Sequence, residues 1–148
     1  MAIKTITMEM QKALDDVVKN FVYVSDERNY GSREAWYIMK QKPYNGDCED
    51  FALTILYNLC GRSVFRLLLS VFIGRGKICY TLSPKGGGHA VLRFRGLYTD
   101  NWQDKWLNKE DYIAKGYTFK PVLFWAYTTS LQLLKGYWIA RKKEKANG

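Results

Sequence analysis

The sequence predicts an α+β domain, in which helices come first and an antiparallel sheet of about five strands follows. Before Gly61, apolar residues recur at three- and four-residue steps, the period of an α-helix. After it, the segments are short, rich in β-branched and aromatic residues, and separated by turn formers, as is typical of strands. The chain has 148 residues with no interdomain linker or internal repeat, so we expect a single domain over residues 1–148.

Two helices are expected in the first part of the chain. The first lies within residues 6–24, where the side chains at helical spacing are Met10, Leu14, Val17, Val18 and Phe21. Residues 23–36 mix turn formers with aromatic residues and are expected to form an ordered loop. The second helix runs from Cys48 to Cys60 and stops before Gly61, because glycine is favoured just past a helix end. It is apolar on most sides, so it should be central.

The second part of the chain is expected to contain the sheet. The predicted strands are residues 63–74, 77–82, 89–94, 97–102 and 119–127. A last helix is expected over residues 130–143. It leads into a short basic tail, residues 141–148, which we expect to be a frayed and solvated end.

Composition limits the class of protein. Apolar residues make up 47% of the chain, which excludes global disorder. The chain contains no run of 18 or more uncharged apolar residues, so no membrane-spanning helix is expected. The N-terminal residues have no apolar signal segment, so a cytoplasmic location is expected, with three free thiols and no disulfide framework. The net charge of +9 points first to a polyanionic partner, either nucleic acid or an anionic surface.

Cys48 is the candidate nucleophile. It lies in the first turn of the predicted central helix, where the helix dipole lowers the pKa of a thiol. Gly46, just before it, would let the backbone approach a substrate closely. The acidic neighbours of Cys48 make a poor setting for a core residue, whereas Cys60 and Cys79 are expected to be structural.

His89 is the chain's single histidine and therefore the candidate base. If residues 95 and 96 form a two-residue hairpin turn, paired residue numbers sum to 191, and His89 then faces Trp102. Asp100 becomes its diagonal neighbour on the same face, close enough for a carboxylate to reach the ring and hold its tautomer. Asn101 is the alternative for this orienting role.

Three carboxylates surround the candidate nucleophile, and unless their charge is compensated they raise its pKa. The compensation could come from basic side chains or from a hard cation such as calcium. Asp47 and Glu49 flank Cys48 and are the candidate calcium ligands, whereas Asp50 is expected to bond groups inside the fold.

Four aromatic residues are expected near this site. Trp36 and Trp102 are the candidates for substrate binding, and Tyr44 and Trp106 are grouped with them. The alternative for all four is ordinary packing around the helix and the hairpin.

Three segments carry a resemblance to a known family. GDCEDFA, GHAVLRF and YTDNW together resemble the bacterial transglutaminase-like cysteine proteinases, which belong to the papain-like and transglutaminase-like group. FVYVSDERNYGSREAW and FKPVLFW extend the similarity over about residues 10–126. The resemblance implies a central helix that carries Cys48 and packs on a sheet that carries His89 and Asp100. It implies that Cys48 attacks a carbonyl, His89 shuttles the proton and Asp100 orients the ring, with calcium at Asp47 and Glu49.

The predicted function is a thiol-dependent hydrolase, a cysteine peptidase or amidase that works through an acyl-enzyme. No cofactor is required for that chemistry. Two alternatives stay open: an acyl transferase with the same three residues, and a basic module that binds nucleic acid or protein without turnover. The basic residues are spread and form no nucleic-acid motif, so the expected partner is a protein or peptide substrate, acidic in character. The chain is shorter than the family's enzymes, basic, and without their export signal, which suggests a phage or mobile-element protein acting inside the cell.

Overall fold

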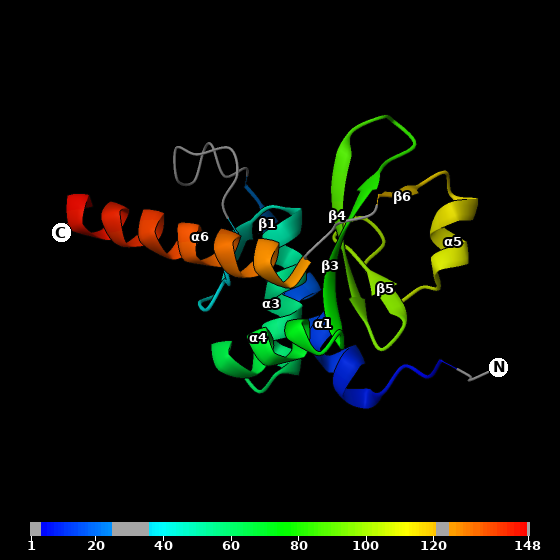
Figure 1. Cartoon of the computed structure of the whole chain (residues 1–148), viewed down its shortest axis with the longest axis horizontal. Helices are drawn as coiled ribbons and strands as arrows, with labels where there is room; N and C mark the ends of the chain where they lie inside the picture. The colour runs from blue at the N-terminus through cyan, green and yellow to red at the C-terminus, as the bar shows by residue number, and fades with distance from the viewer. Residues whose placement is uncertain (1–3, 25–35, 121–124, 148) are drawn as a thin grey trace.

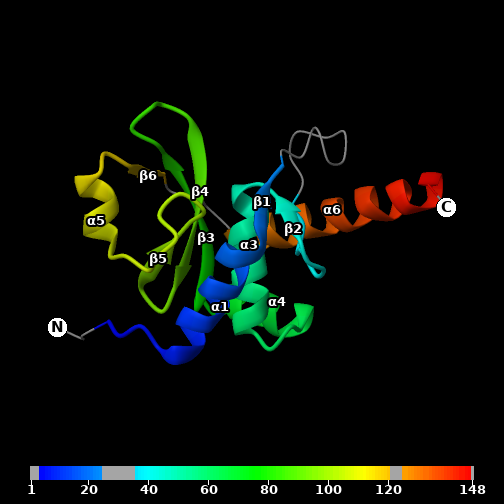
Figure 2. The same ribbon diagram turned by 180° about the vertical axis from the view of Figure 1, so that it is seen from behind.

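A computed structural model describes residues 4–24, 36–120 and 125–147, and it confirms the α+β class. In chain order the elements are α1 (Met8–Asn20), β1 (Phe21–Tyr23), β2 (Tyr44–Gly46), α3 (Cys48–Leu59), α4 (Val64–Phe72), β3 (Gly76–Leu82), β4 (Gly88–Phe94), β5 (Leu97–Thr99), α5 (Lys109–Ala114), β6 (Thr118–Lys120) and α6 (Trp125–Asn147). Helices α1, α3 and α4 lie on one side of the main sheet and α5 on the other (Figures 1 and 2). Of the loop expected over residues 23–36, only the ends are described.

Helix α3 is central, as the sequence predicts. Its N-terminus is closed by a capping box, in which the side chains of Asp47 and Asp50 each accept from the other's backbone N–H. Its buried side chains include Phe51, Leu53 and Leu56, which join the main hydrophobic core with residues of α1 and β4. Both predicted N-terminal helices are confirmed.

The main sheet has four antiparallel strands in the order β5-β4-β3-β6. The turn between β4 and β5 is the predicted two-residue one, with Arg95 and Gly96 both at positive φ (50° and 79°), as a tight hairpin requires. Phe94 pairs with Leu97 and Leu92 with Thr99, so the predicted register is confirmed. The strand expected over residues 97–102 ends at Thr99, and residues 101–103 form a turn instead.

A second, two-stranded parallel sheet was not predicted. It pairs β1 with β2 and aligns Phe21 with Tyr44 and Tyr23 with Gly46. The pairing brings the residues that follow α1 beside the segment that leads into Cys48.

The prediction of a strand over residues 63–74 is wrong, because this segment forms α4. Ser63 caps the helix by accepting from the backbone N–H of Arg66 (3.3 Å), and Leu67 and Val71 are buried one helical turn apart. A short run that is apolar at nearly every position fits both the helical and the strand period, so periodicity does not decide between them.

The C-terminal elements also differ from the expectation. The strand predicted over residues 119–127 is β6, which ends at Lys120. Residues 121–124 lie outside the described part, and α6 begins at Trp125. Helix α6 continues to Asn147, so the tail expected to be frayed is helical. Helix α5, within a stretch expected to be polar loop, was missed, although Asn108 and Asp111 form a capping box at its start.

Gly136 lets α6 pack closely on Trp36 and Tyr37. A Cβ built on Gly136 would overlap the carbonyl oxygen of Trp36, so any larger residue would push the helix away. As for membrane spans, no single helix of the described residues is both long and apolar enough, and α3 with α4 passes only as a pair bent by 102°.

Candidate active site

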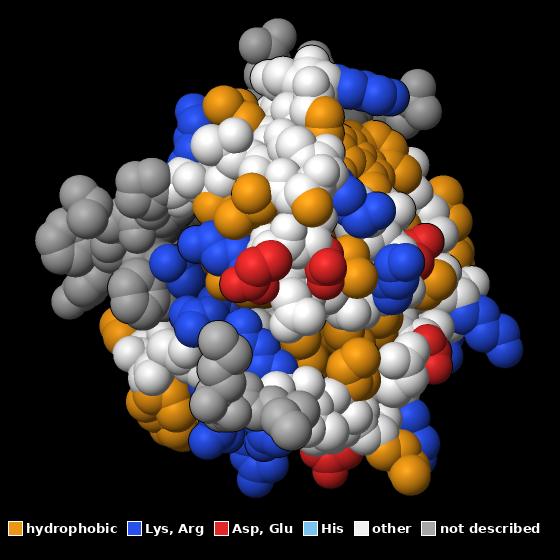
Figure 3. Space-filling model, turned by 90° about the vertical axis from the view of Figure 1, so that its right-hand side faces the viewer, with side chains coloured by type: hydrophobic (Ala, Val, Ile, Leu, Met, Phe, Trp, Pro, Cys, Tyr) orange, Lys and Arg blue, Asp and Glu red, His pale blue; other side chains and the backbone are white. Residues whose placement is uncertain are grey.

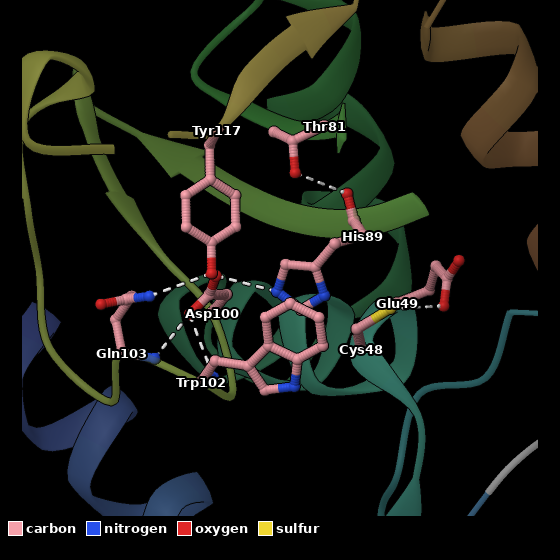
Figure 4. Close-up of polar contacts among 8 residues, drawn as sticks. All are labelled: Cys48, Glu49, Thr81, His89, Asp100, Trp102, Gln103 and Tyr117. Atoms are coloured by element: carbon pink, nitrogen blue, oxygen red, sulfur yellow. Dashed lines mark hydrogen bonds and ion pairs between the residues drawn. The ribbon is translucent and has the colours of Figure 1, made fainter. Parts of the chain in front are cut away.

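Cys48 is the first residue of α3, directly after the capping residue Asp47. Its Sγ donates to Oε2 of Glu49 at 3.1 Å, as Figure 4 shows. The backbone of Ala90 on β4 hydrogen-bonds to the same sulfur. The thiol therefore sits between a carboxylate of its own helix and the strand that carries His89.

The thiol is protonated in this arrangement. Burial raises the pKa of Cys48 far above its ordinary value, and the charges of Glu49 and Asp47 raise it further. The Ala90 contact lowers the pKa but does not outweigh them. The expectation of a lowered Cys48 pKa is thus wrong for this conformation, because desolvation and adjacent carboxylates exceed the effect of the helix N-terminus.

His89, on β4, is buried and held on two sides. Its Nε2 lies 2.8 Å from Oδ2 of Asp100. The Trp102 ring is stacked on the imidazole with centroids 3.7 Å apart and an interplanar angle of 7°. The diagonal neighbour and the facing residue of the hairpin register therefore both contact the ring, and Tyr117 lies tilted to it with centroids 6.3 Å apart.

Asp100 is fully buried and positioned by the turn that follows β5. Its Oδ1 accepts from the backbone N–H groups of Trp102 (3.1 Å) and Gln103 (2.7 Å), while Oδ2 faces His89. Both carboxylate oxygens are thus engaged, and the carboxylate cannot turn without losing these bonds. Asn101, the alternative, does not take this position.

Cys48 and His89 line one cavity. It has a volume of about 520 Å³ and is lined by Phe21, Tyr23, Cys48, Gly88, His89, Asn101 and Trp102. The ring nitrogen of His89 that does not face Asp100 points to the side on which Cys48 lies (Figure 4). Cys48 and His89 therefore share this cavity, whereas Asp100 lies buried behind His89 and contacts it through Oδ2.

Phe21 and Tyr23 in the cavity wall were missed. They belong to β1, and only its pairing with β2 brings them beside Cys48. The sequence around residues 21–23 contains no local signal for this, since a parallel partner is set by the fold and not by a turn.

Trp36, expected with Trp102 to bind substrate, does not line the Cys48 cavity. It is buried, packs 5.9 Å from the ring of Tyr80, and lines a different cavity, between α4 and α6. Tyr44 and Trp106 are also in the core, and Trp106 donates its indole N–H to the carbonyl of Met10 at 3.0 Å. Of the four aromatic residues, Trp102 alone reaches the cavity, so packing accounts for the other three.

Gly46 has a different role from the expected one. Its Cβ, if present, would lie 2.7 Å from the Asp50 side chain and 2.8 Å from Sδ of Met39. The close approach that Gly46 permits is to the inside of the fold and not to a substrate. Asp50 bonds inside the fold as expected, since its Oδ1 accepts from the backbone N–H of Tyr37 at 2.7 Å.

Asp47 and Glu49 form a neighbouring pair of largely buried carboxylates. Burial and the charge of Asp47 raise the pKa of Glu49 from 4.5 to about 7. No described residue adds a third His, Cys, Asp or Glu side chain to make a metal-binding cluster with them. Oxygen donors with uncompensated charge suit a hard cation, whose other ligands would be backbone carbonyls or water.

The fold is similar to that of solved LapG structures. LapG of Legionella pneumophila matches with a TM-score of 0.56 at 24% sequence identity, over 80% of this chain and 62% of that one. Its calcium-bound structure matches with a TM-score of 0.54 at 22% identity, over 80% and 64%. The chain has the fold of LapG. No protein-family model and no curated protein sequence matches it.

LapG is a bacterial transglutaminase-like cysteine protease, so the fold expected from the sequence motifs is confirmed. The present chain spans less than two thirds of the LapG chain.

Proposed function

We propose that this protein is a thiol-dependent hydrolase, a cysteine peptidase or amidase, with Cys48, His89 and Asp100 as its catalytic residues. The observation that best supports this proposal is the placement of His89. Its Nε2 is held by Asp100, while its other nitrogen points toward the side of Cys48. A buried carboxylate, an oriented imidazole and a thiol in this order form the arrangement used for nucleophilic acyl transfer.

Asp100 orients His89, and His89 carries the proton in each step of the proposed reaction. His89 takes the proton of the Cys48 thiol, and Sγ attacks the substrate carbonyl carbon to form a tetrahedral oxyanion. The amine leaves with the proton carried by His89, which leaves an acyl-enzyme. Water, deprotonated by His89, then hydrolyses the thioester and regenerates the thiol. The backbone N–H of Cys48, in the first turn of α3, is the candidate oxyanion donor.

Glu49 opposes the first step in the resting protein, because it accepts from the Cys48 thiol and its charge disfavours a thiolate. We propose that Asp47 and Glu49 hold a calcium ion, as the chemistry of this donor pair allows. A bound cation would supply positive charge that compensates the two carboxylates. The existence of a calcium-bound LapG structure supports this proposal.

The proposed substrate is a peptide or protein. Tyr23 and Trp102 are both more than half exposed at the cavity and present flat aromatic surfaces to an incoming chain. Aromatic walls suit an apolar side chain next to the cleaved bond. The surplus of basic residues supports an acidic character in the rest of the substrate.

The direct test is alkylation of the native protein with iodoacetamide at neutral pH, in the presence of calcium and again in EGTA. We expect Cys48 to react faster than Cys60 and Cys79 when calcium is present, and His89→Ala to abolish the difference. Hydrolysis of fluorescent casein should be lost in Cys48→Ala and kept in Cys60→Ala, the matched control. Equal reactivity of the three thiols in both conditions would contradict the proposal. Addition of dansylcadaverine, a primary amine, separates hydrolysis from acyl transfer.

A further inference from the structure

Helix α4 exposes large apolar side chains on its outer face. Its outer face carries Phe65, Leu69, Phe72 and, at the C-cap, Ile73, all at least half exposed, and Phe65 reaches 77%. The spacing of four, seven and eight residues from Phe65 places them on one side of the helix. The inner face buries Leu67, Ser70 and Val71. Single exposed apolar residues are ordinary, but a contiguous set marks an interaction surface.

An arginine-lined cavity borders this face. It has a volume of about 480 Å³, and Leu69 and Ile73 of the outer face belong to its wall together with Arg66, Arg75 and Arg95. None of the three arginines forms an ion pair with a described carboxylate, and Glu9 is the acidic residue of the described wall. The cavity therefore offers three guanidinium groups to an anion.

The location separates this surface from the candidate active site. Cys48 begins α3, whereas the cavity is lined by Leu59, Cys60 and Gly61 at the other end of that helix. Twelve helical residues at about 1.5 Å each put roughly 18 Å between the two ends. In Figures 1 and 2, α4 lies beside the lower part of the sheet, away from β1 and β2. A partner on α4 therefore leaves the Cys48 cavity open.

The combination of apolar and arginine side chains narrows the choice of partner. Positive charge alone does not, because basic side chains are scattered over other faces as well, such as the one in Figure 3. A second copy placed face to face would bring arginines against arginines. Nucleic acid would pair with the arginines but leave Leu69 and Ile73 uncovered by its phosphates. A phospholipid surface supplies both phosphate groups and an apolar layer just beneath them.

We propose that the outer face of α4 and the adjoining arginine-lined cavity bind an anionic phospholipid surface. Phe65, Phe72, Leu69 and Ile73 enter the boundary between headgroups and acyl chains. Arg66, Arg75 and Arg95 receive lipid phosphates. This surface does not depend on the proposed peptidase activity, since it uses none of the residues of the Cys48 cavity.

The experiment is co-sedimentation of the full chain with vesicles of phosphatidylcholine alone and with phosphatidylglycerol in equal parts. We expect binding to the anionic vesicles, weakened by added sodium chloride. The double variant Arg66→Gln/Arg75→Gln should bind about thirtyfold more weakly, and Phe65→Ser/Phe72→Ser about tenfold or more. These side chains are on the surface, and circular dichroism verifies that each variant is folded.

Control variants come from α5, the residue that follows it and the edge strand β6, all away from α4 (Figure 1). Lys115→Gln/Lys120→Gln removes the same charge, and Ile113→Ser removes an exposed apolar side chain of α5, so both should bind like the unmodified protein. Failure to bind anionic vesicles, or equal losses in the controls, overturns the proposal. It is also overturned if inorganic phosphate displaces the protein while Phe65→Ser/Phe72→Ser binds normally, because the cavity would then be a site for a soluble anion.

Discussion

The indole of Trp102 lies flat on the imidazole of His89, with the ring centroids 3.7 Å apart. Trp102 is 53% exposed, whereas His89 is 2% exposed, so the indole forms the outer cover of the histidine. The same ring is a wall of the cavity that Cys48 lines. One side chain thus excludes water from the candidate base and presents a flat surface to a substrate.

Removal of the indole should therefore affect reactivity more than stability. We expect Trp102→Ala to reduce casein hydrolysis and Cys48 alkylation by about tenfold or more, because His89 loses the contact that fixes its ring plane. Unfolding in urea should show a loss of about 1 kcal/mol, the usual worth of an aromatic pair. Trp102→Phe keeps a stacked ring and should recover most of the activity. Full activity in the alanine variant would contradict this role.

Asp100→Asn tests the orienting carboxylate without removal of the turn. The amide oxygen can still accept from the backbone N–H groups of Trp102 and Gln103, so the variant should remain folded. Its –NH₂ group would face the Nε2 of His89 and favour the wrong tautomer, and we expect turnover to fall by roughly 10³-fold or more. An unchanged near-ultraviolet circular dichroism spectrum would show that the loss of turnover comes from the His89 tautomer and not from unfolding. Asp111→Asn at the start of α5 is the control and should keep full turnover.

Glu49→Gln should make the Cys48 thiol more reactive when calcium is absent. The variant removes one of the charges that raise the pKa of Cys48, so a larger fraction is thiolate. In EGTA at pH 8 we expect alkylation by iodoacetamide to be about tenfold faster for each pKa unit recovered. At pH 6 the difference should shrink, because Glu49, with a pKa of about 7, is then mostly protonated in the parent protein. Identical rates at both pH values, or the same effect in Glu110→Gln, would argue against this account.

The raised pKa of Glu49 also predicts a pH dependence of stability. Below pH 4.5 the Glu49 carboxyl is protonated in both the folded and the unfolded chain, so it does not change the free energy of unfolding. Between pH 4.5 and about 7 the unfolded chain ionises first, so the free energy of unfolding decreases as the pH rises. Above pH 7 the loss reaches about 3 kcal/mol. Urea unfolding in EGTA at pH 5 and pH 8 should show this loss in the parent protein and not in Glu49→Gln. A constant difference between the two proteins across this range would rule it out.

Gly46→Ala tests the packing beneath the nucleophile. The new Cβ would meet the side chains of Asp50 and Met39 at 2.7–2.8 Å, closer than real contacts allow. We expect a loss of about 1–3 kcal/mol in the free energy of unfolding, as for other overpacked sites. Gly87→Ala is the matched control. Its nearest atom would be Oγ of Ser83 at 3.9 Å, so it should change stability by less than about 0.5 kcal/mol. Equal stability of the two variants would show that the Asp50 capping box yields to the added group.

Local rules account for the parts of the fold that could be predicted. The α3 helix is delimited by residues next to it, namely the capping pair at its start and Gly61 after its end. The hairpin register follows from a two-residue turn, and it carries His89, Asp100 and Trp102 to one place without reference to the rest of the chain. The contact of Asp100 with His89 could thus be worked out from residue numbers alone.

Longer-range packing decided what the sequence left open. Residues 63–74 are apolar enough for a strand, yet they form α4, because that helix buries Leu67 and Val71 against the core. Trp36 and Trp102 are equivalent as residue types, but one is enclosed by α6 and the other covers a histidine. The protonated state of Cys48 likewise depends on burial and on the direction of the Glu49 side chain. The sequence by itself determined the helix with the nucleophile and the pairing of the hairpin, since both depend on neighbours in the chain. The tertiary structure alone decided burial, and with it the pKa values, the cavity walls and the exposed face of α4, because burial depends on elements distant in sequence.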